Sequence, residues 1–524
     1  MKTAVIFASV MSLAAPAWAQ DSNSHTGHAD ATKPKAAQIL DGYGHGGMQT
    51  QSKNPRAQAF FDNGLQLAHA FAHKAASDAM AESVRLDPSC VMCAWGEAWA
   101  AGPTINYGVE GDELEAAQKL AARANRLARA NGTPLERSLA SAIVARYRNG
   151  GGGKPGDVAF AAAMQRIVAQ NPDSDELATI AADAVLLAVG ESEDEWKQAS
   201  IKAAEILETV LKRNPAYTPA IHFYIHATEE AGFGYKAEVY ADTIGKDAPK
   251  SQHLVHMPSH TYYWVGRYDD AARVNRQAVD IGIAQAKAMD SPPPEGVFGL
   301  PYHAHNVTFG LGGALMAGDA DTALYLGRPL VEAATNPAVK GLKSPFAQAL
   351  AGSGYVALAL FAPDVEIMAT KAPTYPYLRG LWHYARGEAA ARRKDVAAIR
   401  AESAAISVPR ADEKKEGWSW QAGESLRIAK AVLDGRAAML DGKPAEAAIA
   451  FRRGAELEEQ PAYGRASDPP LWWFPVRREL ANALAAAGDN AGARKEAEAT
   501  LKLRPKDPGA TALLQRLDGK VAAR

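Results

Sequence analysis

From Pro55 onward the chain consists of alanine-rich segments, about 12 to 18 residues long, in which apolar positions recur with a helical period. Short turns containing Gly, Pro, Asp or Asn separate these segments. No stretch alternates apolar and polar residues in the way that a half-buried strand would. The pattern therefore predicts an all-α protein.

Several segments follow the tetratricopeptide (TPR) pattern, a helix–turn–helix unit of about 34 residues with small residues where its two helices touch. In the first such segment, Gly64, Ala76 and Pro88 occupy the small, small and terminating offsets. Similar matches contain Gly266 with Ala271 and Ala278, Ala447 with Phe451, and Gly488 with Ala493 and Pro505. Because one helix pair cannot bury its apolar face alone, neighbouring pairs must stack. We therefore predict a TPR-like right-handed helical solenoid.

The first residues have the features of a secretory signal peptide. Lys2 precedes a mostly apolar run from Ala4 to Ala15, and Ala17-Trp18-Ala19 is a small-x-small cleavage motif. No later stretch holds about eighteen uninterrupted apolar residues, so we expect no membrane span. These features predict a periplasmic or secreted protein that is cleaved near Ala19.

A polar segment follows and lacks a helical apolar stripe, so we expect it to be flexible. It carries His25, His28, His45 and Met48, which either bind copper weakly or are incidental to a solvated linker. The predicted organisation is a signal peptide (1–19), this histidine-containing segment (20–53), an N-terminal and central array with a histidine cluster (54–360) and a C-terminal array (361–524).

The overall charge limits the classes of partner that we expect, and the cysteines bear on the redox state of the compartment. The formal net charge is −2 and there is no basic block, which argues against a nucleic-acid partner. The only cysteines are Cys90 and Cys93, in a CxxC spacing. In an exported protein such a pair favours a local disulfide, with free thiols and a redox pair as the alternatives.

Histidines are concentrated between Ile221 and Trp264. Five of the thirteen lie there: His222, His226, His253, His256 and His260. His222 and His226 are four residues apart, so on a helix their rings share one face and could chelate one ion. His256 and His260 repeat this spacing across Pro258, which suits the first turn of a helix. We predict that the two pairs gather around a transition metal; ordinary hydrogen-bonded helix histidines are the alternative.

Further residues could join this centre if distant repeats converge. We predict His69, His73, His253 and His305 as additional ligands and prefer His305 to His303. For His253 and His305 the alternative is that they orient other ligands. Glu229 is the candidate catalytic residue, as a general base, although it or Glu230 could instead be a ligand or orient an imidazole. A ligand set dominated by imidazole favours copper, then iron or zinc, over magnesium or calcium.

Five runs of sequence resemble a family of exported bacterial TPR proteins. They are FDNGLQLAHAFAHKAASDAMAESVRLDPSCVMCAWGEAWAAGPTIN, HFYIHATEEAG, HLVHMPSHTYYWVGRYDDAARVNRQAV, YHAHN and DPPLWWFPVRRELANAL. The resemblance spans roughly Ala57 to Pro505, and HLVHMPSH is its most specific part. It implies the repeat fold and the exported compartment, and it carries over no catalytic residue.

Two classes of function remain. The first is a metalloenzyme, an oxidoreductase rather than a hydrolase, acting on a small molecule or peptide held in the solenoid groove. The second is a non-catalytic scaffold that binds a protein or peptide partner, or a metal store. Outside the cluster, we expect His383 to be a packed helix residue. Trp472–Pro475 is either packing at a repeat start or a platform for stacking a ligand.

Overall fold

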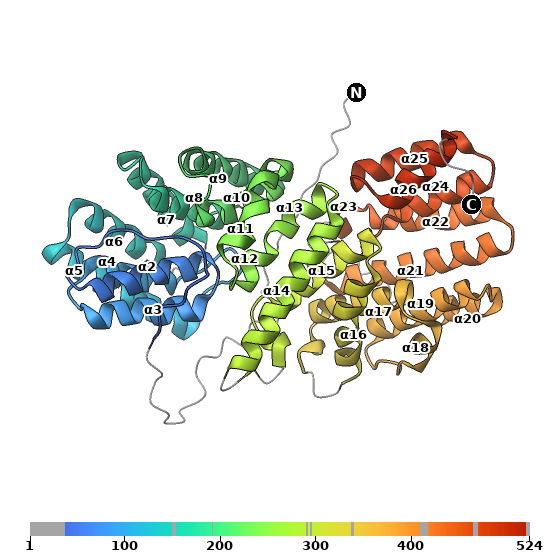
Figure 1. The fold of residues 1–524 in the computed structure, drawn as a ribbon, viewed down its shortest axis with the longest axis horizontal. Coiled ribbons are helices and arrows are strands. Elements are labelled where there is room, and N and C mark those ends of the chain that lie inside the picture. The colour runs from blue at the N-terminus through green and yellow to red at the C-terminus, as the bar shows by residue number, and fades with distance from the viewer. Residues whose placement is uncertain are drawn as a thin grey trace. The chain divides into compact units, whose positions relative to one another are not determined.

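The computed structural model describes residues 37–148, 154–190, 192–289, 292–293, 296–336, 340–408, 418–464 and 470–519. Across these residues every regular element is a helix, which confirms the all-α prediction (Figure 1). Among them, no helix is long and apolar enough to cross a membrane. The predicted signal peptide lies outside the described residues, and so do His25 and His28 of the segment that follows it.

The described residues fall into two compact units, which meet in sequence between Thr261 and Tyr262. We call residues 37–261 unit 1 and residues 262–519 unit 2. The domain boundary predicted after residue 360 falls within unit 2, near the end of one helix, and stays a prediction.

In unit 1, helices that follow one another along the chain pack against each other, as TPR-like helix pairs do. Its elements are α2 (Pro55–His69), α3 (His73–Leu86), α4 (Val91–Ala100), α5 (Gly111–Asn131), α6 (Pro134–Tyr147), α7 (Lys154–Gln170), α8 (Asp175–Leu187), α9 (Glu193–Arg213), α10 (Thr218–Glu230), η1 (Gly234–Ala237), α11 (Glu238–Asp247), α12 (Gln252–His256) and the start of α13 (Pro258–Trp264).

Unit 2 is built in the same manner. Its elements are α14 (Tyr268–Ala288), η2 (Gly296–Gly299), α15 (His303–Ala317), α16 (Ala320–Thr335), η3 (Lys340–Lys343), α17 (Pro345–Phe361), α18 (Asp364–Ala369), α19 (Pro376–Arg392), α20 (Val396–Ala405), α21 (Trp418–Leu440), α22 (Pro444–Glu458), α23 (Pro461–Gly464), α24 (Val476–Ala486), α25 (Asn490–Leu503) and α26 (Pro508–Leu517).

Small residues stand where paired helices touch, as the repeat pattern predicted. A Cβ atom added at Gly64 of α2 would lie 2.8 Å from the Met80 side chain of α3. At Gly313 of α15 it would lie 2.6 Å from the backbone nitrogen of Ala272 in α14. Between α24 and α25, Gly488 turns the chain with a φ of +86°, a conformation that favours glycine. The TPR-like packing within each unit therefore follows from these offsets.

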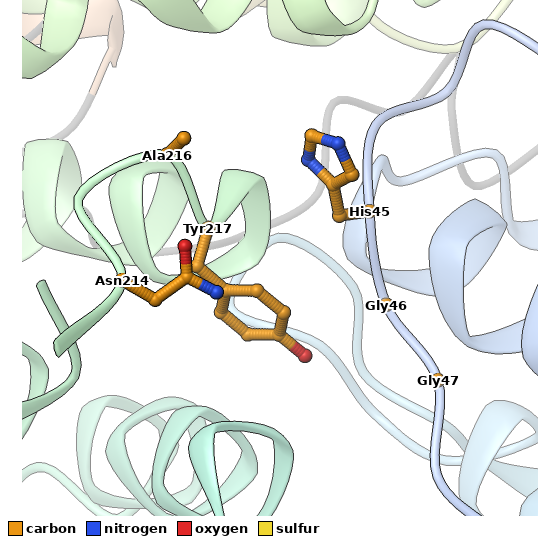
Figure 2. A pocket seen from close by; sticks show the side chains of 6 residues that line it. All are labelled: His45, Gly46, Gly47, Asn214, Ala216 and Tyr217. Carbon is orange, nitrogen blue, oxygen red and sulfur yellow. The ribbon is translucent and has the colours of Figure 1, made fainter.

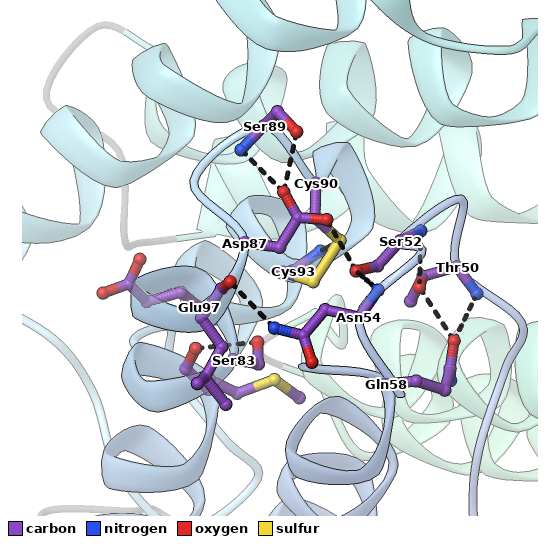
Figure 3. Close-up of a disulfide and its surroundings, with 12 residues drawn as sticks. Thr50, Ser52, Asn54, Gln58, Ser83, Asp87, Ser89, Cys90, Cys93 and Glu97 are labelled. Atoms are coloured by element: carbon purple, nitrogen blue, oxygen red, sulfur yellow. Dashed lines mark hydrogen bonds between the residues drawn. A yellow bond between two sulfur atoms is a disulfide. The ribbon is translucent and has the colours of Figure 1, made fainter. Parts of the chain in front are cut away.

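The predicted disulfide between Cys90 and Cys93 is present at the start of α4 (Figure 3). The loop before it is held by Asp87, whose Oδ1 accepts hydrogen bonds from the backbone and hydroxyl of Ser89. Its other oxygen accepts from the Ser52 hydroxyl at 2.6 Å. Cys90 is also the N-cap of α4, because its Sγ accepts from the Cys93 backbone N–H. The disulfide therefore links two residues at the start of α4, where hydrogen bonds already hold the backbone in place.

Residues 37–53 differ from the predicted flexible linker, because their backbone groups find partners on the helices of unit 1. The Asn63 side chain donates to the Leu40 carbonyl at 2.7 Å and accepts from its N–H. Farther along, Gly47 N–H donates to the buried Glu176 carboxylate at 3.1 Å. The low apolar content predicted disorder, but polar side chains of α2 and α8 supply the missing contacts.

Two other predictions concern unit 2. Trp472, Trp473 and Phe474 are buried directly before α24, and the Trp472 ring meets Tyr384 edge-on at 5.3 Å between centroids. The packing interpretation of this aromatic run is the one that the structure favours. The His383 ring bonds through Nδ1 to Glu402 at 2.7 Å, so it is an ordinary packed helix histidine, as expected.

Candidate metal centre

Three helices of unit 1 carry the histidines of the central cluster. His222 and His226 lie on α10, His253 and His256 on α12, and His260 on α13. The Ser251 hydroxyl caps α12 by accepting from Leu254 N–H, and α13 begins at Pro258 as predicted. No ring of the five belongs to a residue more than 5% exposed. The sequence therefore places five imidazoles in the interior of unit 1.

His222 pairs with His253 across two helices. Their Nε2 atoms lie 3.0 Å apart, and the Nδ1–H of His222 donates to the main-chain carbonyl of His69 at 2.7 Å. A carbonyl oxygen only accepts, so the proton of neutral His222 is on Nδ1 and its Nε2 lone pair faces His253. Burial lowers the pKa of His222 to about 3, which keeps the ring neutral near pH 7.

His256 and His260 form a second pair, with their Nε2 atoms also 3.0 Å apart. The Nδ1–H of His260 donates to the Glu229 carboxylate at 2.6 Å, and Nδ1 of His256 lies 3.3 Å from the Ser259 hydroxyl. Glu229 is thus positioned to orient His260. Its predicted role as a general base stays a prediction.

His226 stands between the two pairs. Its ring centroid lies 5.1 Å from that of His222 and 5.2 Å from that of His260. One ligand atom from each of His222, His226 and His253 lies within 4.8 Å of the others. The same holds for His226, Glu229 and His260. The four-residue spacing within α10 therefore brings His222 and His226 near each other, while Nε2 of His222 lies 3.0 Å from Nε2 of His253.

These distances fit a transition metal. Two nitrogens bonded to one ion at about 2.0–2.1 Å, subtending about 90° to 110°, would lie about 2.9 to 3.4 Å apart. The Nε2 atoms of His222 and His253 lie within that range. Metal-binding histidines also usually donate their other N–H to a carbonyl or a carboxylate, as His222 and His260 do here.

Aromatic side chains line the cluster on one side. The Phe71 ring stacks on His253 at 4.8 Å between centroids and meets His222 edge-on at 4.6 Å. The Phe223 ring stacks on His222 at 4.8 Å between centroids. Phe71 adopts a φ of +56°, which is uncommon for a residue with a side chain. The backbone at the end of α2 therefore turns this ring toward the imidazoles, where it lowers the local polarity.

Two predicted ligands of α2 and α3 have other partners. The Nε2 atom of His69 lies 2.6 Å from the Glu176 carboxylate, and both side chains are buried. His73 is half-buried, with its ring against Phe71 at 5.3 Å and Tyr107 at 5.4 Å. Neither belongs to the groups of converging ligand atoms in the described part of the chain. What His69 contributes to the cluster is its carbonyl group.

The last predicted ligand, His305, lies on α15 in unit 2. It is half-buried, with its ring 4.7 Å from that of Phe309. Its neighbour His303 is buried, and burial lowers the pKa of His303 to about 4. The predicted participation of His305 in the centre of unit 1 stays a prediction.

The sequence analysis did not identify Glu176 or Tyr217 as residues near the cluster. Besides His69, the Glu176 carboxylate accepts hydrogen bonds from the Tyr217 hydroxyl and from Gly47 N–H. Burial raises its pKa, but the charge and hydrogen bond of His69, together with the other donors, outweigh burial and lower it. Nothing in the spacing of these residues could have linked them, since Glu176 lies on α8 and Tyr217 directly precedes α10, far apart in sequence.

Tyr217 also lines a surface pocket of about 300 Å³ (Figure 2). His45, Gly46 and Gly47 of the N-terminal segment face Asn214, Ala216 and Tyr217 before α10. The His45 ring is held by the Thr218 hydroxyl at 2.8 Å. Hydrogen bonds thus run from this pocket through Tyr217 and Glu176 to His69, whose carbonyl contacts the metal-ligand candidate His222.

Comparison with known proteins adds the following. No protein-family model matches the chain, and no curated protein matches it. Among solved structures, the human IFIT1 dimer with PPP-AAAA is 12% identical, with 90% of this chain and 92% of that chain covered and a TM-score of 0.27. Yeast Tom70 is 11% identical, with 89% of each chain covered and a TM-score of 0.26. The TPR domain of P58(IPK) is 13% identical, with 89% and 99% covered and a TM-score of 0.22. Likeness at this level assigns no function to the chain.

Proposed function

We propose that this chain is an exported helical-repeat metalloprotein, in which His222, His226 and His253 hold a transition-metal ion. The observation that carries this proposal is the Nε2–Nε2 contact of 3.0 Å between His222 and His253, with the His222 proton directed away to His69. Ligand atoms of all three histidines lie within 4.8 Å of one another. Three neutral imidazoles favour copper, then iron or zinc.

The proposed activity is metal-dependent oxidation of a small molecule or peptide. Copper and iron supply one-electron chemistry, which nitrogen ligands in an apolar setting support, and Phe71 and Phe223 provide such a setting. The second candidate is a non-catalytic protein that stores metal or binds a protein partner. Burial of all three histidines favours this second candidate, because a substrate would have to displace protein to reach the ion.

Metal analysis of the exported full-length protein tests the proposal. We expect bound copper, iron or zinc in the wild type, and loss of metal in His222→Ala and His253→Ala. His383→Ala is the matched control, since that histidine bonds Glu402 and should leave the metal unchanged. A wild-type protein without metal, or variants that keep full occupancy, would refute the proposal.

A measurement of oxygen consumption distinguishes the two candidate functions. Oxygen uptake by the metal-loaded wild type is followed with a panel of small phenols and peptides. Uptake that disappears in His253→Ala supports the oxidative enzyme. A metal-loaded protein that consumes no oxygen with any of them supports storage or scaffolding.

A further inference from the structure

We infer that unit 1 holds two metal ions, the second between His256 and His260. This inference rests on the proposed function and extends it from a single ion to a two-ion centre. The second pair repeats the geometry of the first, with an Nε2–Nε2 distance of 3.0 Å and complete burial of both residues.

The hydrogen bonds around the second pair leave a nitrogen lone pair directed into it. Nδ1 of His260 faces the Glu229 carboxylate at 2.6 Å, and an ionised carboxylate only accepts, so this nitrogen carries the proton. Nε2 of neutral His260 is then a lone-pair donor that faces Nε2 of His256. The Ser259 hydroxyl, 3.3 Å from Nδ1 of His256, orients the second ring.

A single ion cannot serve both pairs. Nitrogens bonded to one ion at about 2.1 Å must all lie within about 4.2 Å of one another. Among the described residues, no group of converging ligand atoms contains both His253 and His260. The rings of His253 and His256, one from each pair, have centroids 5.7 Å apart. The prediction that His222, His226, His256 and His260 surround one ion therefore gives way to two positions.

His226 connects the two positions. Because its ring centroid is nearly equidistant from those of His222 and His260, its imidazole is within reach of either ion. An imidazole has two nitrogens, and each binds a metal when deprotonated. His226 is therefore the residue whose loss should affect both ions.

The buried charges suit two cations rather than one. The Glu229 carboxylate contacts His260 directly, and the Glu176 carboxylate contacts His69, whose carbonyl accepts from His222. Both carboxylates are buried. The Glu229 carboxylate behind the second pair, and the Glu176 carboxylate linked to the first pair through His69, each offset part of the cost of burying a divalent cation. The ligand class is thus a pair of borderline transition-metal ions, with copper favoured.

The experiment is a copper titration of the metal-free full-length protein, followed by elemental analysis. We expect two ions in the wild type, one in the His256→Gln/His260→Gln variant and one in the His222→Gln/His253→Gln variant. The control His383→Gln should bind two. Circular dichroism establishes that each variant is folded.

The outcomes separate the two proposals. A wild type that binds no ion refutes both. A wild type that binds one ion, lost on changing His222 and His253 but kept on changing His256 and His260, preserves the proposed function and overturns the second ion. If a variant does not fold, magnetic coupling between two Cu(II) ions in the wild-type electron paramagnetic resonance spectrum decides. An uncoupled spectrum from one Cu(II) overturns the inference.

Discussion

His222 donates through Nδ1 to the main-chain carbonyl of His69, over a sequence separation of 153 residues and a distance of 2.7 Å. The contact selects the tautomer in which Nε2 of His222 is free to accept a metal ion. His69 turns its own imidazole away, toward Glu176. The observed contact of His69 with the cluster is thus made by its backbone, and the predicted role of its side chain as a ligand stays a prediction.

Replacing His69 by Ala tests this division of roles. The carbonyl remains, so we expect metal content to stay at the wild-type level. The Glu176 carboxylate loses one buried partner, and the free energy of unfolding should fall by about 3 kcal/mol. Elemental analysis and denaturant unfolding measure the two effects. A folded variant that has lost its metal would show that the His69 ring is a ligand after all.

Glu229 should control the second ion more than the first. In Glu229→Gln the amide oxygen still accepts from Nδ1 of His260, but the negative charge is lost. We expect the affinity of the second ion to fall about 10- to 100-fold, as when other groups that orient a metal ligand are changed. Stepwise metal titration measures this affinity. Glu402→Gln removes the same charge beside His383 and should alter neither step.

The repeat fold was predictable because each helix carries its own apolar period, and small residues such as Gly64 mark where it meets its partner. The histidines of the cluster could also be predicted, because five of them lie close together in the sequence between Ile221 and Trp264. Their pairing could not, because His222 meets His253 through the packing of α10 against other helices rather than through the four-residue spacing. The role of Glu176 could not be predicted for the same reason, since only the folded chain brings its carboxylate to His69.

The disulfide should stabilise the protein modestly. A bridge between Cys90 and Cys93 closes a very short loop, for which chain entropy gives about 2 kcal/mol. We expect Cys90→Ser/Cys93→Ala to lower the free energy of unfolding by about that amount in denaturant titrations. Thiol labelling of the wild type without reductant should modify neither cysteine. Quantitative labelling of both would contradict the bridge.

Glu458, at the end of α22, predicts a pH dependence in unit 2. Burial raises its pKa from 4.5 to about 8, although Arg504 and the Val476 N–H oppose the shift. Between these values the folded state binds a proton that the unfolded state has released. The free energy of unfolding should therefore fall as pH rises from about 4.5 to about 8.

Glu458→Gln removes this dependence and keeps an acceptor for Val476 N–H. Above pH 8 the variant should be more stable than the wild type by at most about 5 kcal/mol, the free energy that corresponds to the full pKa shift. Denaturant unfolding across the pH range checks this. If both proteins lose stability in parallel between about pH 5 and 8, Glu458 is not the source of the slope.

The carbonyl of His69 also bears on how such a centre can change over generations. Any residue at position 69 offers a main-chain oxygen, so the group that orients His222 survives every substitution that leaves the backbone in place. Related chains can therefore drift at this position and keep the same imidazole tautomer. A comparison of sequences would find the histidines that we propose as ligands and overlook the main-chain atom that orients one of them.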